Sequence, residues 1–128
     1  MPTFDDSALS HAPPEEVWKL LYDPGRFPEW WAGMATVRDS GDGSFTFYAD
    51  GWPDFPMPQL IDSAREERRV VISCQVSDLE FEWRLEPDGD GTRIDVHVEI
   101  PDKEAERLEA QREVIRRSVA RLAEVAAA

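Results

Sequence analysis

The amino-acid sequence predicts an α+β fold in which seven antiparallel strands form one sheet, covered by a long C-terminal helix. Residues 79–85 and 94–100 alternate between apolar and mostly charged side chains, as expected of strands with one buried and one solvated face. Short turn segments such as SGDG and PDGDG join the predicted strands, which makes neighbouring strands antiparallel. Residues 103–126 contain no Pro or Gly and carry apolar side chains at helical spacing.

The remaining elements follow from breaks in these patterns. A first strand is predicted over residues 3–11, before Pro13 and Pro14, because proline cannot donate to a strand ladder. Pro14 suits the first turn of a short helix that ends at the DPG segment of residues 23–25, and a second helical turn covers 26–33. Six further strands are predicted at 35–39, 44–50, 58–66, 68–77, 79–87 and 92–100.

The alternation also assigns side chains to the two faces of the sheet. In the last strand, Arg93, Asp95, His97 and Glu99 share one parity and are predicted to face solvent. The apolar side chains at the alternate positions of the strands, together with the apolar stripe of the C-terminal helix, are predicted to form the core. We expect substantial burial of Trp18, Phe81, Trp83, Ile94, Val96, Ile115 and Leu122.

Size and charge narrow the functions to be considered. The 128 residues are predicted to form a single domain, 1–128. The net charge of −13, from 14 basic and 27 acidic residues, argues against nucleic-acid or anionic-membrane partners, which need clustered Lys and Arg. The N-terminus lacks the features of a signal peptide, and a single cysteine fits a reducing compartment, so a cytoplasmic location is expected.

Few residues indicate chemistry. His11 and His97 lie on different predicted strands and Cys74 is the only cysteine, so no metal site is predicted and no cofactor is expected. Cys74 falls on an apolar parity, which predicts a buried, inert thiol. Asp62 and Arg65, on an irregular strand, are polar groups that could face inward, but the sequence assigns no catalytic residue.

The segment APPEEVWKLLYDPGRFPEWW, residues 12–31, joins the two short helices to a Trp-Trp pair. With the order of elements, it resembles the START-like (SRPBCC) superfamily, in particular the bacterial polyketide cyclase/dehydrase-like branch. The resemblance implies a helix-grip fold, in which a strongly curved seven-stranded sheet wraps around the C-terminal helix and two short helices plug one end. This scaffold holds many different ligands, so the family does not by itself give the function. The matching residues are Ala12, Pro14, Val17, Trp18, Asp23, Phe27, Pro28 and Trp30.

The resemblance also implies a cavity between the sheet and the long helix, although an interior filled by side chains is the alternative. The segment DGWPDFPMP, residues 50–58, is interpreted either as a lid or as a stiff turn whose aromatic residues cover a gap in the core. Further wall positions are Phe45, Ile72, Val76, Phe81, Leu85, Leu108, Ile115 and Val119. The residues predicted to bound the cavity are Trp31, Phe47, Trp52, Phe55, Cys74 and Trp83.

Three functions stay open at this point. The preferred one is binding of a small hydrophobic or aromatic molecule in the cavity. A second is a polyketide cyclase or dehydratase, which the family resemblance implies, so whether the protein is an enzyme is uncertain. A third is a protein-interaction module that uses the long helix or the acidic outer face of the sheet. The expected partner is a small hydrophobic molecule, and a homodimer is left open.

Overall fold

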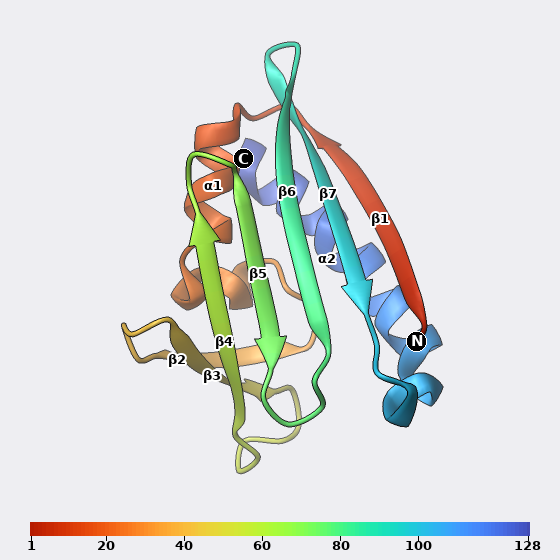
Figure 1. Cartoon of the computed structure of the whole chain (residues 1–128). Coiled ribbons are helices and arrows are strands. Elements are labelled where there is room, and N and C mark those ends of the chain that lie inside the picture. Colours follow the sequence, from red (N-terminus) through yellow and green to blue (C-terminus); the bar gives the residue numbers. More distant parts are fainter.

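The computed structural model describes residues 1–128 and has seven strands in one antiparallel sheet, with both α-helices on one side (Figure 1). The predicted fold class is confirmed. The strands lie in the order β1-β7-β6-β5-β4-β3-β2. Their bounds are Thr3–Ser10 (β1), Met34–Asp39 (β2), Ser44–Ala49 (β3), Met57–Ala64 (β4), Arg69–Cys74 (β5), Glu80–Asp88 (β6) and Gly91–Glu99 (β7). The helices are α1 (Pro14–Leu21), the 3₁₀ helices η1 (Pro24–Glu29) and η2 (Asp102–Arg107), and α2 (Leu108–Ala127).

The largest difference from the predicted elements is the start of the C-terminal helix. A continuous helix is predicted from Lys103, but α2 begins at Leu108 and is preceded by the 3₁₀ helix η2. Glu104 has non-helical backbone angles, with φ −114° and ψ 15°. No side chain of η2 packs against the core, whereas Leu108 is partly buried against it, so tertiary packing favours the α-helical form from Leu108 onward.

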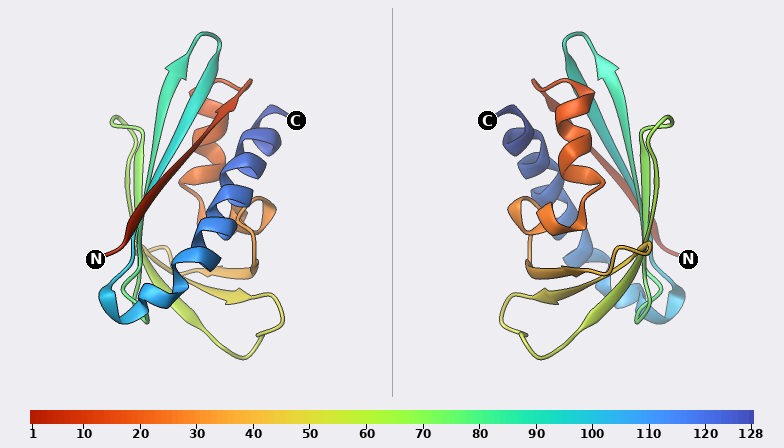
Figure 2. Two further views of the ribbon diagram at one scale, coloured as in Figure 1. Left: turned by 90° about the vertical axis from the view of Figure 1, so that its right-hand side faces the viewer. Right: turned by 90° about the vertical axis from the view of Figure 1, so that its left-hand side faces the viewer.

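The sheet is bent, and the helices occupy its concave side. Figure 2 shows β2 and β3 turning away from the other strands, toward the side on which α1 and α2 lie. Helix α2 crosses this side diagonally and packs most extensively against β1. Its first two turns contribute no buried residue. Neither helix combines the length and apolar character that a membrane crossing requires. The buried residues of α2 are Ile115, Ser118, Val119, Leu122 and Ala123.

The predicted core is confirmed: all seven side chains expected to be buried are at most 7% exposed. The second short helical segment adds an aromatic cluster, in which Trp83 meets Trp30 edge-to-face at 5.1 Å and Trp31 at 5.3 Å between ring centroids. The Nε1 of Trp30 donates to the carbonyl of Leu20 at 3.0 Å. The Nε1 of Trp83 is buried without a hydrogen-bond partner.

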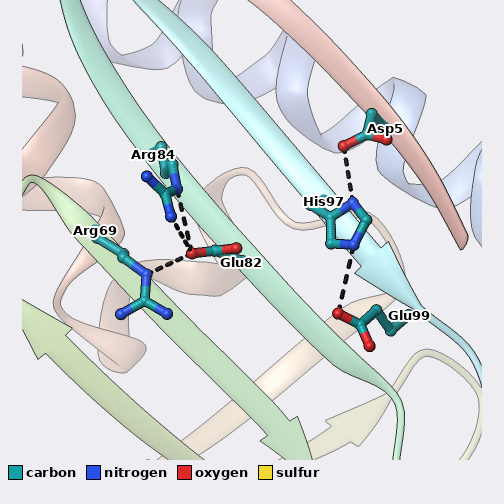
Figure 3. A network of polar contacts seen from close by, with 6 residues as sticks. All are labelled: Asp5, Arg69, Glu82, Arg84, His97 and Glu99. Atoms are coloured by element: carbon teal, nitrogen blue, oxygen red, sulfur yellow. Dashed lines mark hydrogen bonds and ion pairs between the residues drawn. The ribbon is translucent and has the colours of Figure 1, made fainter.

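The outer face of the sheet is charged, as predicted, and its charges are paired (Figure 3). The Nδ1 of His97 lies 2.8 Å from the Oδ1 of Asp5, and its Nε2 lies 3.4 Å from the Oε2 of Glu99. The hydrogen bond to Asp5 raises the pKa of His97 despite the opposing effect of burial. On β6, Glu82 accepts hydrogen bonds from two arginines of the same face, which hold the pKa of Glu82 below its usual value.

Buried hydroxyl groups fix the C-terminal half of α2 to the rest of the chain. The Oγ of Ser118 accepts from the backbone N–H of Ala32 at 2.9 Å and donates to the carbonyl of Val114 at 2.7 Å. The Oγ of Ser10, at the end of β1, donates to the carbonyl of Ala123 at 2.8 Å. These bonds hold β1 and the segment after η1 to α2, at the end of the molecule where the helix is buried.

Candidate functional site

A cavity of about 430 Å³ lies between the N-terminal turns of α2 and the concave face of β3 to β6. This volume falls within the roughly 300–1,000 Å³ range of small-molecule sites. Of its 18 lining residues, 13 are hydrophobic. The cavity occupies the region where α2 has no buried residue. The sheet wall consists of Met34, at the start of β2, and of Phe47, Ala49, Met57, Gln59, Ile72, Cys74 and Phe81.

The structure brings five of the six predicted residues to this cavity: Trp31, Phe47, Trp52, Phe55 and Cys74. Trp83 does not line it. Its side chain is 0% exposed, and the ring of Trp31 packs between Trp83 and the cavity at 5.3 Å. Both side chains are aromatic, so the sequence does not show which of them lines the cavity. The fold of the segment after η1 decides this, because it places the ring of Trp31 against Trp83.

The loop between β3 and β4 carries two exposed aromatic side chains at the edge of the cavity. Trp52 is 59% exposed and Phe55 is 60% exposed, and their rings meet edge-to-face at 5.5 Å. Both residues also line the cavity. Their exposure is inconsistent with the interpretation that they cover a gap in the core, because side chains in that role would be buried. They instead form an aromatic rim.

The sheet wall contains a small polar region. Gln59 and Cys74 are paired in register on β4 and β5, and both are buried. Gln59 Nε2 donates to the carbonyl of Met57 at 3.3 Å. Burial raises the pKa of the Cys74 thiol, but hydrogen bonds from Ser77, from the Val76 backbone and from Gln59 outweigh this effect and leave the pKa below its usual value. The predicted burial of Cys74 is confirmed.

The helix wall is formed by Arg107, the last residue of η2 and the N-cap of α2, and by Gln111 and Val114 of α2. Their spacing of four and three residues places them on one face of the helix. Arg107 is the only charged residue that lines the cavity. It makes one ion pair, with Glu104, and the nitrogen-to-oxygen distance of 3.9 Å is long.

The apolar pattern of the sequence does not predict this wall. The apolar stripe predicts that Leu108, Ile115 and Val119 line the cavity, but none of them does. Ile115 and Val119 are buried in the packed half of the helix. The stripe therefore identifies the face that packs on the sheet. The cavity is lined by the adjacent face, one residue earlier in each turn.

Other predicted positions also lie away from the cavity. Val76 is 58% exposed because β5 ends at Cys74 and residues 75–77 form a turn. Asp62 lies on the outward parity of β4, and Arg65 follows that strand and pairs with Glu15 at 3.0 Å. Phe45 is buried in the core instead. Neither histidine lines the cavity, and no group of three or more His, Cys, Asp or Glu side chains could hold a metal ion.

A second hollow, of about 640 Å³, lies beside the first and shares the segment Trp31–Met34 with it. Its charges are of both signs, so it does not select an anion or a cation by charge alone. The charged residues that line it are Asp50, Arg116, Arg117, Arg121 and Glu124.

Comparison with solved structures supports the architecture. XoxI from Bacillus cereus matches with a TM-score of 0.77 and 16% identity, over 98% of this chain and 95% of that one. The di-domain ARO/CYC protein BexL, from the BE-7585A biosynthetic pathway, matches with a TM-score of 0.82 and 17% identity, over 97% of this chain but 46% of BexL. The di-domain ARO/CYC protein StfQ, from the steffimycin biosynthetic pathway, matches with a TM-score of 0.73 and 16% identity, over 96% and 44% of the two chains.

At these identities the structural matches establish the fold alone. Among curated protein sequences, none matches this chain significantly. A family model described as "Polyketide cyclase / dehydrase and lipid transport" matches residues 1–127, which is nearly the whole chain. That match agrees with the resemblance in residues 12–31 and with the observed order of strands and helices. The chain therefore belongs to the polyketide cyclase/dehydrase and lipid transport family, within the SRPBCC group of helix-grip proteins.

Proposed function

We propose that the protein binds a small hydrophobic molecule, with at least one aromatic or otherwise flat part, in the cavity beneath α2. The observation that carries the proposal is the apolar cavity of about 430 Å³ with Trp31, Trp52 and Phe55 among its lining residues. A flat ligand can stack on these rings and remove both its own surface and exposed aromatic surface from water. Each Å² of apolar surface removed from water is worth about 25 cal/mol, before the costs of ordering and association.

Intrinsic fluorescence tests this proposal directly, because Trp31 and Trp52 line the cavity. A panel of flat aromatic and fatty molecules should contain members that quench or shift the emission and raise the melting temperature. Trp52→Ala should weaken their binding several-fold, since it removes half of the aromatic rim. Leu9→Ala is the matched control, because Leu9 is 67% exposed and lies on β1 outside the cavity. A panel without any effect on emission or melting temperature would contradict the proposal.

A second candidate is turnover of the bound molecule, as in cyclisation of an aromatic polyketide. The family description and the ARO/CYC titles of BexL and StfQ suggest this chemistry. The observation that favours it is the buried polar region of the sheet wall, where Cys74 has a lowered pKa beside Gln59 and Ser77. Incubation with a reactive poly-ketone, followed by mass spectrometry, should then show a cyclised product at a rate that falls in Cys74→Ala. Binding without product would support the first candidate.

The interaction module is less well supported. A filled interior with an exposed apolar patch would favour it, whereas the structure contains a cavity of ligand size. Native mass spectrometry of protein purified from its own host would address all three functions, because a retained small molecule would identify the ligand class.

A further inference from the structure

We propose that the ligand is an amphipathic acid, whose carboxylate binds Arg107, at the junction of η2 and α2, and Gln111 on α2, while its apolar body occupies the cavity. This inference rests on the proposed function and specifies the class of ligand. Its starting point is that Arg107 is the only charged residue among the 18 that line an otherwise apolar cavity.

The Arg107 guanidinium has no close partner within the protein, which leaves it available to an external anion. The protein has 27 acidic residues, and several arginines outside the cavity pair closely with one of them: Arg93 lies 3.0 Å from Asp95, and Arg116 lies 2.6 Å from Glu113. Arg107 reaches only Glu104, at 3.9 Å, which is beyond hydrogen-bond distance. Its fork of N–H donors is therefore free to bind a carboxylate in the bidentate manner that suits guanidinium groups.

The order of side chains along the helix matches an amphipathic molecule. Arg107, Gln111 and Val114 follow one another on one face, so a charged donor is succeeded by a neutral amide and then by an apolar group. The packed part of α2 begins at Ile115, and Arg107 lies at the far, open end. A ligand would thus keep its charged end at the mouth and its apolar end toward the core.

The partial exposure of Arg107 also lowers the desolvation cost of binding a carboxylate. Its side chain is 37% exposed, so a bound carboxylate keeps part of its hydration and avoids the penalty of a fully buried ion pair. The opposite wall offers only uncharged polar groups, Gln59 and Ser77, with the thiol of Cys74. Those groups suit a neutral hydroxyl or carbonyl of the ligand. Among the lining residues, the helix wall alone supplies a positive charge.

A matched pair of probes tests the inference: 2-naphthylacetate and its uncharged analogue 2-naphthylacetamide, titrated by calorimetry. The wild-type protein should bind the acid about tenfold more tightly than the amide, since a hydrogen-bonded charge pair exceeds a neutral contact by roughly that factor. Arg107→Gln should weaken the acid about tenfold and change the amide less than twofold. Raising the salt concentration should weaken the acid selectively.

Arg117→Gln is the matched control, because Arg117 lies on α2, carries the same charge as Arg107 and does not line this cavity. It should change neither affinity more than twofold, and thermal melting should show that both variants are folded. Equal binding of acid and amide, or an equal loss of both in Arg107→Gln, would overturn the inference and leave the proposed function intact. If neither probe nor any member of the fluorescence panel binds, the proposed function fails and the inference fails with it.

Discussion

Replacing Trp83 with phenylalanine should destabilise the protein less than the same replacement of Trp30, although both side chains are 0% exposed. The two rings touch each other, with centroids 5.1 Å apart, so they share one environment. They differ in their N–H groups. The Nε1 of Trp30 donates to the carbonyl of Leu20 at 3.0 Å, whereas the Nε1 of Trp83 is buried without a partner.

The expected difference follows from these two groups. Both replacements lose similar apolar volume, so the cost of the smaller ring largely cancels in the comparison. Trp30→Phe also breaks a hydrogen bond whose net worth is about 1 kcal/mol. Trp83→Phe removes an unpaired buried donor, which relieves about 1–3 kcal/mol. The free energy of unfolding should therefore be about 2–4 kcal/mol higher for Trp83→Phe than for Trp30→Phe.

Urea denaturation followed by circular dichroism measures this difference. With a slope of about 1–3 kcal/mol per molar urea, a gap of 2 kcal/mol separates the two midpoints by about 1 M. The slopes should be equal, because both variants expose the same surface on unfolding. Equal midpoints, or a lower midpoint for Trp83→Phe, would refute the assignment of an unpaired donor at Trp83.

Three further perturbations should report on other parts of the structure. Gly91→Ala should cost about 2 kcal/mol in urea denaturation, because a Cβ there would lie 2.2 Å from the carbonyl oxygen of the last residue of β1; an unchanged midpoint would contradict this close approach. Ser118→Ala should cost about 1–3 kcal/mol, since it leaves the Ala32 N–H without its partner, and Ser118→Thr should restore part of the loss if the hydroxyl is what matters. The hydrogen bond to Asp5 raises the folded-state pKa of His97. The stabilisation from this pair is therefore complete below the unfolded-state pKa and is lost as pH rises through the folded-state pKa. Asp5→Asn should lower the melting temperature more at pH 5 than at pH 9, and an equal effect at both pH values would contradict the predicted role of the pair.

Much of the fold could be predicted because local patterns and tertiary packing agree in most of the chain. Alternation in β6 and β7 gave the buried and exposed faces, and short turns gave the antiparallel order. The helix start was misplaced because the absence of Pro and Gly permits a helix from Lys103 without requiring one. The apolar side chains that select the α-helical form begin at Leu108, so the boundary depends on burial.

The candidate site was predictable on the sheet wall and unpredictable on the helix wall, for one physical reason. Parity in a strand fixes which side chains face the concave side, and Phe47 and Cys74 were assigned in this way. Parity does not tell a side chain that lines a cavity from one covered by another ring, as Trp31 covers Trp83. In the helix, the apolar stripe identifies the packed face, whereas an arginine that lines a cavity resembles any solvated arginine in sequence.

The cavity and the bonds that fix α2 are separated along the helix, and this separation bears on how the site can vary. Ser118, through its Oγ, and Ala123, through its carbonyl, hold the buried half of the helix to the segment after η1 and to β1. Arg107, the last residue of η2, and Gln111, on α2, line the cavity where neither η2 nor the first two turns of α2 bury a residue. If the proposed function holds, substitutions in the first half should therefore change the ligand while the second half preserves the fold. Under that proposal, the open helix end beside the bent sheet provides the site, and the side chains that line it decide which molecule binds.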